Sequence, residues 1–195
     1  MSQDGEDKFI CKFFNNKKNG CLVDIGAADG IGGSNSYCLI NTLGWKGLLV
    51  EPYSEYFNKL KQLYINNTMA ICINCAVSDV DNKQSILYIG GRVSTIIRKF
   101  TERSELRKVD YSKTEIVNCY KLVTLLNKHM NHDIDFLSLD CEGSEIDALV
   151  SLHDFSYRIN LICVEHSMKL DILEQTMKKL DYKLIFKTPG NSFFE

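Results

Sequence analysis

Short apolar runs alternate along the chain with longer stretches in which apolar residues recur every three or four positions. The short runs predict strands and the longer stretches predict helices, and this alternation is typical of βαβ units and a parallel sheet. Strands are predicted at 21–26, 46–50, 69–77, 85–89, 134–140 and 161–166, and helices at 36–43, 54–66, 122–129, 144–151 and 170–180. The pattern therefore predicts an α/β fold.

Four segments fall outside this alternation. The runs 182–186 and 192–194 flank a Pro-Gly-Asn turn and predict a closing antiparallel hairpin, whereas 90–118 lacks an apolar period and predicts a long excursion with one helix near 101–108. Residues 1–18 are expected to form a tail or a helix. We expect one domain over 1–195, and the end of the chain inside an apolar run is compatible with excision from a longer polypeptide.

Composition narrows the class of protein. The chain has 195 residues, 45% of them hydrophobic, and a formal net charge of -2, so it offers no basic track for nucleic acid. No apolar run approaches the roughly 18 residues of a membrane span, and the polar N-terminus is unlike a signal peptide. We therefore expect a cytoplasmic protein with no membrane or nucleic-acid partner. Cys72 and Cys75 have the spacing of a zinc knuckle, but no second ligand pair completes it.

The first predicted strand leads into the turn Gly26-Ala27-Ala28-Asp29-Gly30. Ligands of parallel α/β sheets bind beyond the carboxyl ends of the strands, and small residues let them approach the backbone. The turn lacks the G-x-G-x-x-G pattern of phosphate-binding loops, and an acid in it repels pyrophosphate. Asp29, together with Asp24 on the strand, suits a cationic ligand such as S-adenosylmethionine, which carries an ammonium and a sulfonium.

Acids also follow the next two predicted strands. Glu51 comes directly after strand 46–50, where a carboxylate can accept both ribose hydroxyl protons. Asp79 follows the third strand and is placed to accept a hydrogen bond from the exocyclic amine of adenine. In this order and at this spacing, the turn and the two acids predict a nucleoside-binding site.

The residues that carry these features resemble the FkbM-type methyltransferases over about 20–167. The matching segments, in the family's order, are Asp24–Gly30, Ser34–Ser36, Gly44–Gly47, Val50–Pro52, Cys75–Asp79, Ile134–Glu145 and Val164–Glu165. The resemblance implies the class I methyltransferase (Rossmann-like) fold with a mostly parallel, doubly wound sheet, S-adenosylmethionine as donor and usually a hydroxyl oxygen as acceptor. The cofactor-binding residues are then expected to be Asp24, Gly26, Ala27, Asp29, Ser34, Asn35, Glu51, Pro52, Ser78, Asp79 and Asp140. Ala28 stands where the family often has Asn, which removes one hydrogen bond.

Transfer of a methyl group to an alcohol requires in-line positioning and removal of the hydroxyl proton, by a base or by a metal that lowers its pKa. Asp140 and Glu142 follow one predicted strand, and Glu165 and His166 follow the next. If those strands are neighbours, the four side chains converge near the methyl group.

Three interpretations of this acidic group stay open. Glu142 or His166 acts as a base, or Asp140, Glu165 and His166 hold a divalent ion while Glu142 takes the proton. The second arrangement is similar in position to TylF-type sugar O-methyltransferases, and one His with two carboxylates favours Mn²⁺ over Mg²⁺. In the third interpretation, Glu142 and Glu145 only cap the following helix, and capping is the main role we expect of Glu145.

The function expected from these residues is O-methylation of a sugar or glycan hydroxyl, because an acidic cleft suits neutral polyols. A small natural product or an RNA ribose is the alternative acceptor. A non-catalytic nucleoside-binding module is disfavoured by the intact turn, Glu51, Asp140 and Glu142. Within 90–118, Arg92 lies in a Gly/Ser-rich segment and either touches the acceptor or is solvated.

Overall fold

The computed structural model describes residues 5–102, 108–165 and 170–195. Its helices are α1 (Glu6–Phe13), α2 (Tyr37–Asn41), α3 (Ser54–Leu63), α4 (Arg98–Thr101), α6 (Leu122–His129), α7 (Glu145–Ser151) and α8 (Leu170–Lys179), with short 3₁₀ turns η1 (Gly91–Val93) and η2 (Leu152–Asp154). Its strands are β1 (Cys21–Ile25), β2 (Lys46–Val50), β3 (Ala70–Ile73), β4 (Ala76–Val77), β5 (Lys83–Ile89), β6 (Lys113–Tyr120), β7 (Ile134–Leu139), β8 (Ile159–Glu165), β9 (Leu184–Lys187) and β10 (Asn191–Phe194).

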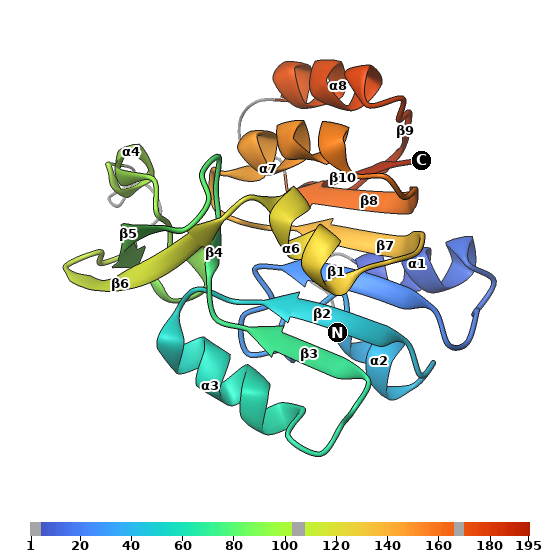
Figure 1. The fold of residues 1–195 in the computed structure, drawn as a ribbon, viewed down its shortest axis with the longest axis horizontal. Coiled ribbons are helices and arrows are strands. Elements are labelled where there is room, and N and C mark those ends of the chain that lie inside the picture. The colour runs from blue at the N-terminus through green and yellow to red at the C-terminus, as the bar shows by residue number, and fades with distance from the viewer. Residues whose placement is uncertain (1–4, 103–107, 166–169) are drawn as a thin grey trace.

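A seven-stranded sheet in the order β3-β2-β1-β7-β8-β10-β9 forms the centre of the molecule (Figure 1). The five strands from β3 to β8 run parallel, and β10 and β9 add an antiparallel hairpin at one edge. The strand order reverses direction between β1 and β7, which is where doubly wound sheets bind ligands. The predicted α/β fold and its C-terminal hairpin are therefore confirmed.

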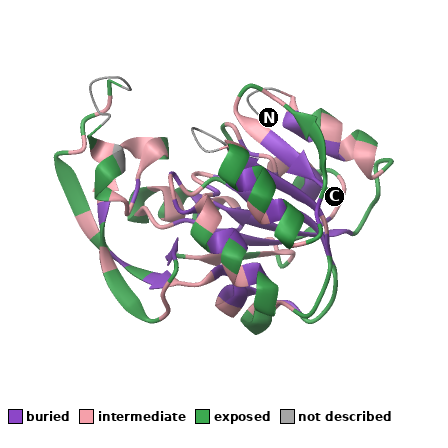
Figure 2. Cartoon of the chain, turned by 90° about the horizontal axis from the view of Figure 1, so that it is seen from above, coloured by how far each residue is buried: buried purple, intermediate pink, exposed green. Residues whose placement is uncertain are grey.

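Helices cover both faces of this sheet. One apolar cluster joins the sheet to α6, α7 and α8 through residues such as Leu126, Leu149 and Met177. A second cluster joins the opposite face to α1, α2 and α3 through residues such as Ile10 and Leu60. Because both faces are covered, the central strands are buried almost throughout, as Figure 2 shows in purple.

A second, three-stranded sheet, in the order β4-β6-β5, corrects two predictions. The run 69–77 is not one strand, because it breaks after Ile73, where the Asn74 side chain donates hydrogen bonds of 2.9 Å to the carbonyls of Glu51 and Pro52. The segment 113–120 is not irregular but forms β6, which pairs antiparallel with β5. Its apolar residues lie on both faces, with Val117 buried and Ile116 exposed, and this hides the period.

The excursion projects beyond the carboxyl ends of the central strands, on the left of Figure 1. Among its described residues is the short helix α4, which overlaps the predicted helix 101–108 only at Thr101, and 103–107 lie outside the described residues. Residues 1–18, expected to form a tail or a helix, contain the helix α1. All eight cysteines lie within the described ranges and are free thiols. Over those same ranges, no helix has both the length and the apolar character needed to cross a membrane.

Candidate functional site: a cleft at the strand-order switch

The carboxyl ends of four neighbouring strands lie level with one another. In the parallel pairings between these strands, the last residues are Ile25, Val50, Leu139 and Val164. The residues that follow them directly are therefore brought together at one edge of the sheet: Gly26, Glu51, Asp140 and Glu165. This is the convergence that the sequence predicted for the acids after the strands.

Two adjoining pockets open at this edge and share Gly26, Arg92 and Asp140. We call the first the turn pocket, whose walls include Glu6, Asp24, Ala27, Ser34, Asn35, Ser138 and Asn191. We call the second the Glu51 pocket, whose walls include Glu51, Pro52, Val77, Leu87, Ile96 and Glu142. Most of the predicted cofactor-binding residues therefore line one continuous cleft.

Gly26 lets the first turn touch the loop after β7. Its φ is 84°, and a Cβ atom at this position would overlap the main-chain oxygen of Asp140. The main-chain N–H of Asp140 donates a 3.0 Å hydrogen bond to the carbonyl of Ile25, which fixes the same approach. A glycine is therefore required by both backbone conformation and space.

Glu51 supports the turn as well as lining its pocket. Its two carboxylate oxygens accept 2.8 Å hydrogen bonds from the main-chain N–H groups of Ala28 and Tyr53. Ala28 has a φ of 48°, in the left-handed region, so the bond to Glu51 helps to hold a strained residue. Burial raises the pKa of Glu51 to about 7, against the opposing effect of these two N–H donors.

Asp24 is buried beneath the turn pocket. Ser36 donates a 2.6 Å hydrogen bond to its carboxylate, and Asn35 donates one of 3.2 Å to the hydroxyl of Ser138. Burial raises the pKa of Asp24 to about 6, although hydrogen bonds from Ser36 and Ser138 act in the opposite direction. The Asn35 Oδ1 atom is buried and has no hydrogen-bond partner among the described residues.

Asp29 is turned away from the cleft. Its carboxylate accepts 3.1 Å hydrogen bonds from the N–H groups of Ile31 and Gly32 and forms a two-pronged ion pair with Arg92. Arg92 also donates to the carbonyl of Gly32. Asp29 lines neither pocket, so its predicted contact with the cofactor has no support in this arrangement, and its charge is balanced within the protein.

Ser78 and Asp79 also lie outside the two pockets. The Ser78 hydroxyl donates to the carbonyl of Val80, and the Asp79 side chain is exposed, so the predicted contact with adenine is likewise not supported. The Glu51 pocket is instead walled by apolar side chains, among them Leu87 from β5 and Ile96 from the excursion. The sequence did not point to these two, because only the second sheet brings them to the cleft.

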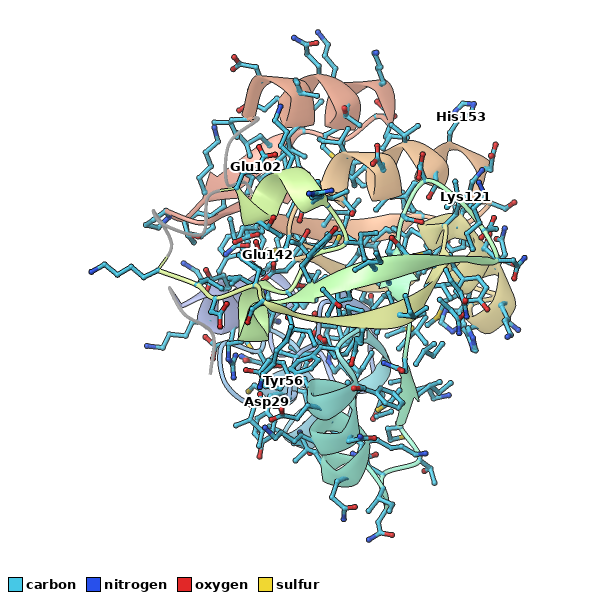
Figure 3. The ribbon with its side chains drawn as sticks, turned by 90° about the vertical axis from the view of Figure 1, so that its left-hand side faces the viewer. Asp29, Tyr56, Glu102, Lys121, Glu142 and His153 are labelled. Carbon is cyan, nitrogen blue, oxygen red and sulfur yellow. The ribbon has the colours of Figure 1, made fainter. Side chains whose placement is uncertain are left out.

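The loop after β7 is strained where it reaches the Glu51 pocket. Glu142 has a φ of 49°, and Gly143, which follows it, has a φ of 116°. The Glu142 side chain is buried, and its carbonyl accepts a 2.8 Å hydrogen bond from the Thr95 hydroxyl. Figure 3 looks onto this edge of the molecule and shows Glu142 and Asp29 on it. Non-glycine residues held at positive φ gather at functional sites.

Three carboxylates meet beside this loop. Atoms of Asp140, Glu145 and Glu165 lie within 4.8 Å of one another. The pKa of Asp140 is raised well above its ordinary value, first by desolvation and then by Glu165 and Glu142. Glu145 accepts hydrogen bonds of 2.9 to 3.1 Å from the N–H groups of Cys141 and Gly143, which is the capping role expected for it.

His166, the other predicted base and metal ligand, lies outside the described residues. Two residues that the sequence did not indicate line the turn pocket, namely Glu6 at the start of α1 and Asn191 at the start of β10. Neither belongs to a recognisable motif, and they reach the pocket only through the packing of both chain ends against the sheet.

A family model described as the methyltransferase FkbM domain matches residues 24–184. No curated protein matches the chain. Among solved structures, a methyltransferase FkbM from Methylobacillus flagellatus KT matches with a TM-score of 0.54 at 13% identity, over 92% of this chain and 43% of its own.

Two further solved structures share the fold. The METTL16 MTase domain matches with a TM-score of 0.54 at 12% identity, over 96% of this chain and 64% of its own. TrmK from M. capricolum, in complex with S-adenosylhomocysteine, matches with a TM-score of 0.51 at 10% identity, over 100% of this chain and 67% of its own. The chain thus spans less than two thirds of the FkbM and METTL16 chains, and these likenesses show a class I methyltransferase fold.

Proposed function

This chain belongs to the FkbM methyltransferase family, and on that premise we propose that it transfers the methyl group of S-adenosylmethionine to a hydroxyl oxygen of a carbohydrate. One observation carries the proposal: Gly26, Glu51 and Asp140 meet in a single cleft at the point where the strand order reverses. That is the position at which doubly wound sheets bind a nucleoside cofactor.

The cleft has the right chemistry for each part of the cofactor. The Glu51 carboxylate would accept hydrogen bonds from the ribose hydroxyls, and the apolar walls of the Glu51 pocket, such as Leu87, would pack against the adenine ring. The turn pocket, with its carboxylates and amides, takes the methionine part. When bound, the cofactor supplies a methyl group on a sulfonium.

An oxygen acceptor fits this cleft better than a nitrogen acceptor. A hydroxyl group needs a base, whereas an uncharged amine attacks through its lone pair. The cleft offers two carboxyl groups beside the loop after β7 for this role, Asp140 and Glu142. Glu142, buried in the wall of the Glu51 pocket, is the side chain that we assign as base, with Asp140 orienting the hydroxyl.

A carbohydrate is the acceptor that matches a cleft lined by carboxylates. Neighbouring hydroxyls of a sugar can donate to Asp140 and Glu142 at once, and no positive charge is needed to hold a neutral polyol. A small natural product with one hydroxyl uses fewer of these acceptors. RNA would need phosphate contacts that a chain of net charge -2 provides poorly.

A divalent metal is a second way to activate the hydroxyl. Asp140 and Glu165 offer carboxylate oxygens within 4.8 Å of each other, which Mg²⁺ or Mn²⁺ can bind. Glu145, the third acid of the cluster, is less suitable because it already accepts hydrogen bonds from main-chain N–H groups. Turnover that is equal in EDTA and in Mn²⁺ or Mg²⁺ would favour the metal-free base.

A screen with methyl-labelled S-adenosylmethionine tests the proposal. The acceptors are free sugars, sugar nucleotides and oligosaccharides, with hydroxylated natural products, amines and RNA as comparison classes. We expect the label in a sugar methyl ether, and we expect Glu142→Gln to abolish most of it. Label found only in an amine, or none in any class while the cofactor binds, would contradict O-methylation of a carbohydrate.

A further inference from the structure

The turn pocket is completed by residues from the two ends of the chain. Glu6 belongs to α1 and Asn191 to β10, and both lie outside the segment 24–184 that the family model matches. The matched segment therefore forms only part of this pocket. A charged side chain that reaches the pocket from outside the matched segment requires an explanation.

Glu6 is a buried carboxylate held in place by neighbouring donors. Its side chain is 1% exposed, and its Oε1 atom accepts hydrogen bonds of 3.0 Å from the Asn191 amide and 3.2 Å from the Thr188 hydroxyl. Burying a carboxylate is costly, and a first-turn acid can stabilise its helix from the surface just as well. Helix stabilisation alone therefore does not explain why Glu6 lies in the pocket wall.

Aromatic packing fixes the helix that carries Glu6. The Phe9 ring stacks on Phe186 with centroids 4.3 Å apart and meets Phe193 edge-on at 4.8 Å. Ile10, on the same helix, is fully buried. These contacts hold α1 against the β9–β10 hairpin, so Glu6 has a defined position rather than that of a mobile N-terminal residue.

The other two acids of the turn pocket belong to other parts of the site. Asp24 accepts a 2.6 Å hydrogen bond from Ser36, and Asp140 is part of the carboxylate cluster with Glu145 and Glu165. The methionine part of the cofactor brings an ammonium with three N–H donors into this pocket. Asn35 Oδ1 lacks a partner among the described residues, which is an independent sign that the pocket binds a ligand with a hydrogen-bond donor.

We propose that Glu6, oriented by Asn191, is the carboxylate that binds the α-ammonium of the cofactor, with Asn35 Oδ1 as a second acceptor. The inference rests on the proposed function, because it concerns the cofactor of that same site. It means that both chain ends must be docked on the sheet before the cofactor binds tightly.

The test compares two ligands that differ only in the ammonium. S-adenosylhomocysteine carries it, and the desamino analogue keeps the carboxylate but lacks the ammonium. The variant is Glu6→Gln, which preserves side-chain shape. Calorimetry should show that it binds S-adenosylhomocysteine about tenfold more weakly than wild type does, because the loss of a charge-assisted hydrogen bond costs this much affinity. Its affinity for the analogue should stay within about twofold of wild type. The matched control is Asp7→Asn, which neutralises the next residue of α1, outside the pocket wall.

Equal weakening of both ligands by Glu6→Gln would assign Glu6 a purely structural role and overturn the proposal, as would no change in either. If the variant does not fold, the affinities of the wild-type protein for the two ligands provide the test. Equal affinities would mean that no residue binds the ammonium. Failure of the proposed function gives a different result, namely wild-type protein that binds neither ligand.

Discussion

A side chain at position 26 would occupy the space held by the main-chain oxygen of Asp140. These two residues follow neighbouring strands on either side of the point where the strand order reverses. Both residues line both pockets, and their contact joins the turn 26–30, which we call the cofactor turn, to the loop 140–143, which we call the acidic loop. The geometry of the cofactor turn and that of the acidic loop therefore depend on each other.

Gly26→Ala should destabilise the protein by about 2–5 kcal/mol, since it combines steric overlap with a positive φ. Urea unfolding measures the change, and calorimetry should show that S-adenosylhomocysteine binding is lost. Gly190→Ala is the matched control, because a Cβ atom there meets nothing within 4 Å. A Gly26→Ala protein as stable as the Gly190→Ala protein would contradict the contact.

Arg92 and Asp29 should be energetically coupled. Their two-pronged ion pair ties the excursion to the cofactor turn at a partly exposed site, for which about 0.5–1 kcal/mol of coupling is expected. A double-mutant cycle with Arg92→Met and Asp29→Asn, followed by urea unfolding, measures it. Arg92→Lys should recover little, because one ammonium cannot replace two guanidinium nitrogens, of which Nη2 donates to Asp29 and Nη1 to the Gly32 carbonyl. Strictly additive effects would show that the pair does not hold the turn.

The stability of the cofactor-free protein should depend on pH through Glu51. Burial raises the pKa of Glu51 from 4.5 to about 7, so between these values the folded protein keeps a proton that the unfolded chain has released. The contribution of Glu51 is fully present below pH 4.5 and is lost as the pH rises through 7. Glu51→Gln should therefore lose less stability than wild type between pH 5 and pH 8, as urea unfolding at both values will show. An identical loss of stability in both proteins would exclude the raised pKa of Glu51.

Cofactor binding should depend on the same proton. Ribose hydroxyls donate to the ionised form of Glu51, so binding below pH 7 requires the carboxyl to release its proton. Affinity for S-adenosylhomocysteine should fall by up to about tenfold per pH unit below 7. Calorimetry in buffers of different ionisation enthalpy counts the released proton, and an affinity that is constant from pH 6 to pH 8 would refute the linkage.

Glu142→Gln should reduce turnover by about 10²–10⁴-fold and leave the affinity for S-adenosylhomocysteine within about twofold of wild type. The reason is that we assign Glu142 to the acceptor hydroxyl, whereas the proposed contacts of the cofactor are with Glu51, the apolar wall of its pocket and the turn 26–30. Single-turnover kinetics with an identified acceptor measures the rate. A variant that retains wild-type turnover would remove Glu142 as the base and leave Asp140 as the candidate within the described residues.

Much of the fold was predictable because the buried parallel strands are continuous apolar runs. Strands β1, β2 and β7 end close to where the sequence placed them, and the residues after them, such as Gly26 and Glu51, follow from that. β6 was missed because it has one buried face and carries an exposed apolar residue, Ile116, on the other. A pattern read along the chain cannot separate these two faces.

The parts of the site that sequence reasoning missed depend on long-range packing. Glu6 and Leu87 reach the cleft from α1 and from the second sheet, and no local motif marks either. Asp29 is a different case, because an acid in a binding turn suggested a ligand contact and the structure gives that carboxylate partners within the protein. Its carboxylate instead accepts hydrogen bonds from the turn itself and pairs with Arg92, 63 residues away.

Calorimetric titration of the wild-type chain with S-adenosylmethionine tests the central claim most directly, with Glu51→Ala as the comparison. The cleft predicts one binding site per chain in wild type and an affinity at least about tenfold weaker in Glu51→Ala, which leaves the ribose hydroxyls without their acceptor. Absence of binding to folded wild-type protein at high micromolar ligand, or equal binding to both proteins, would contradict it.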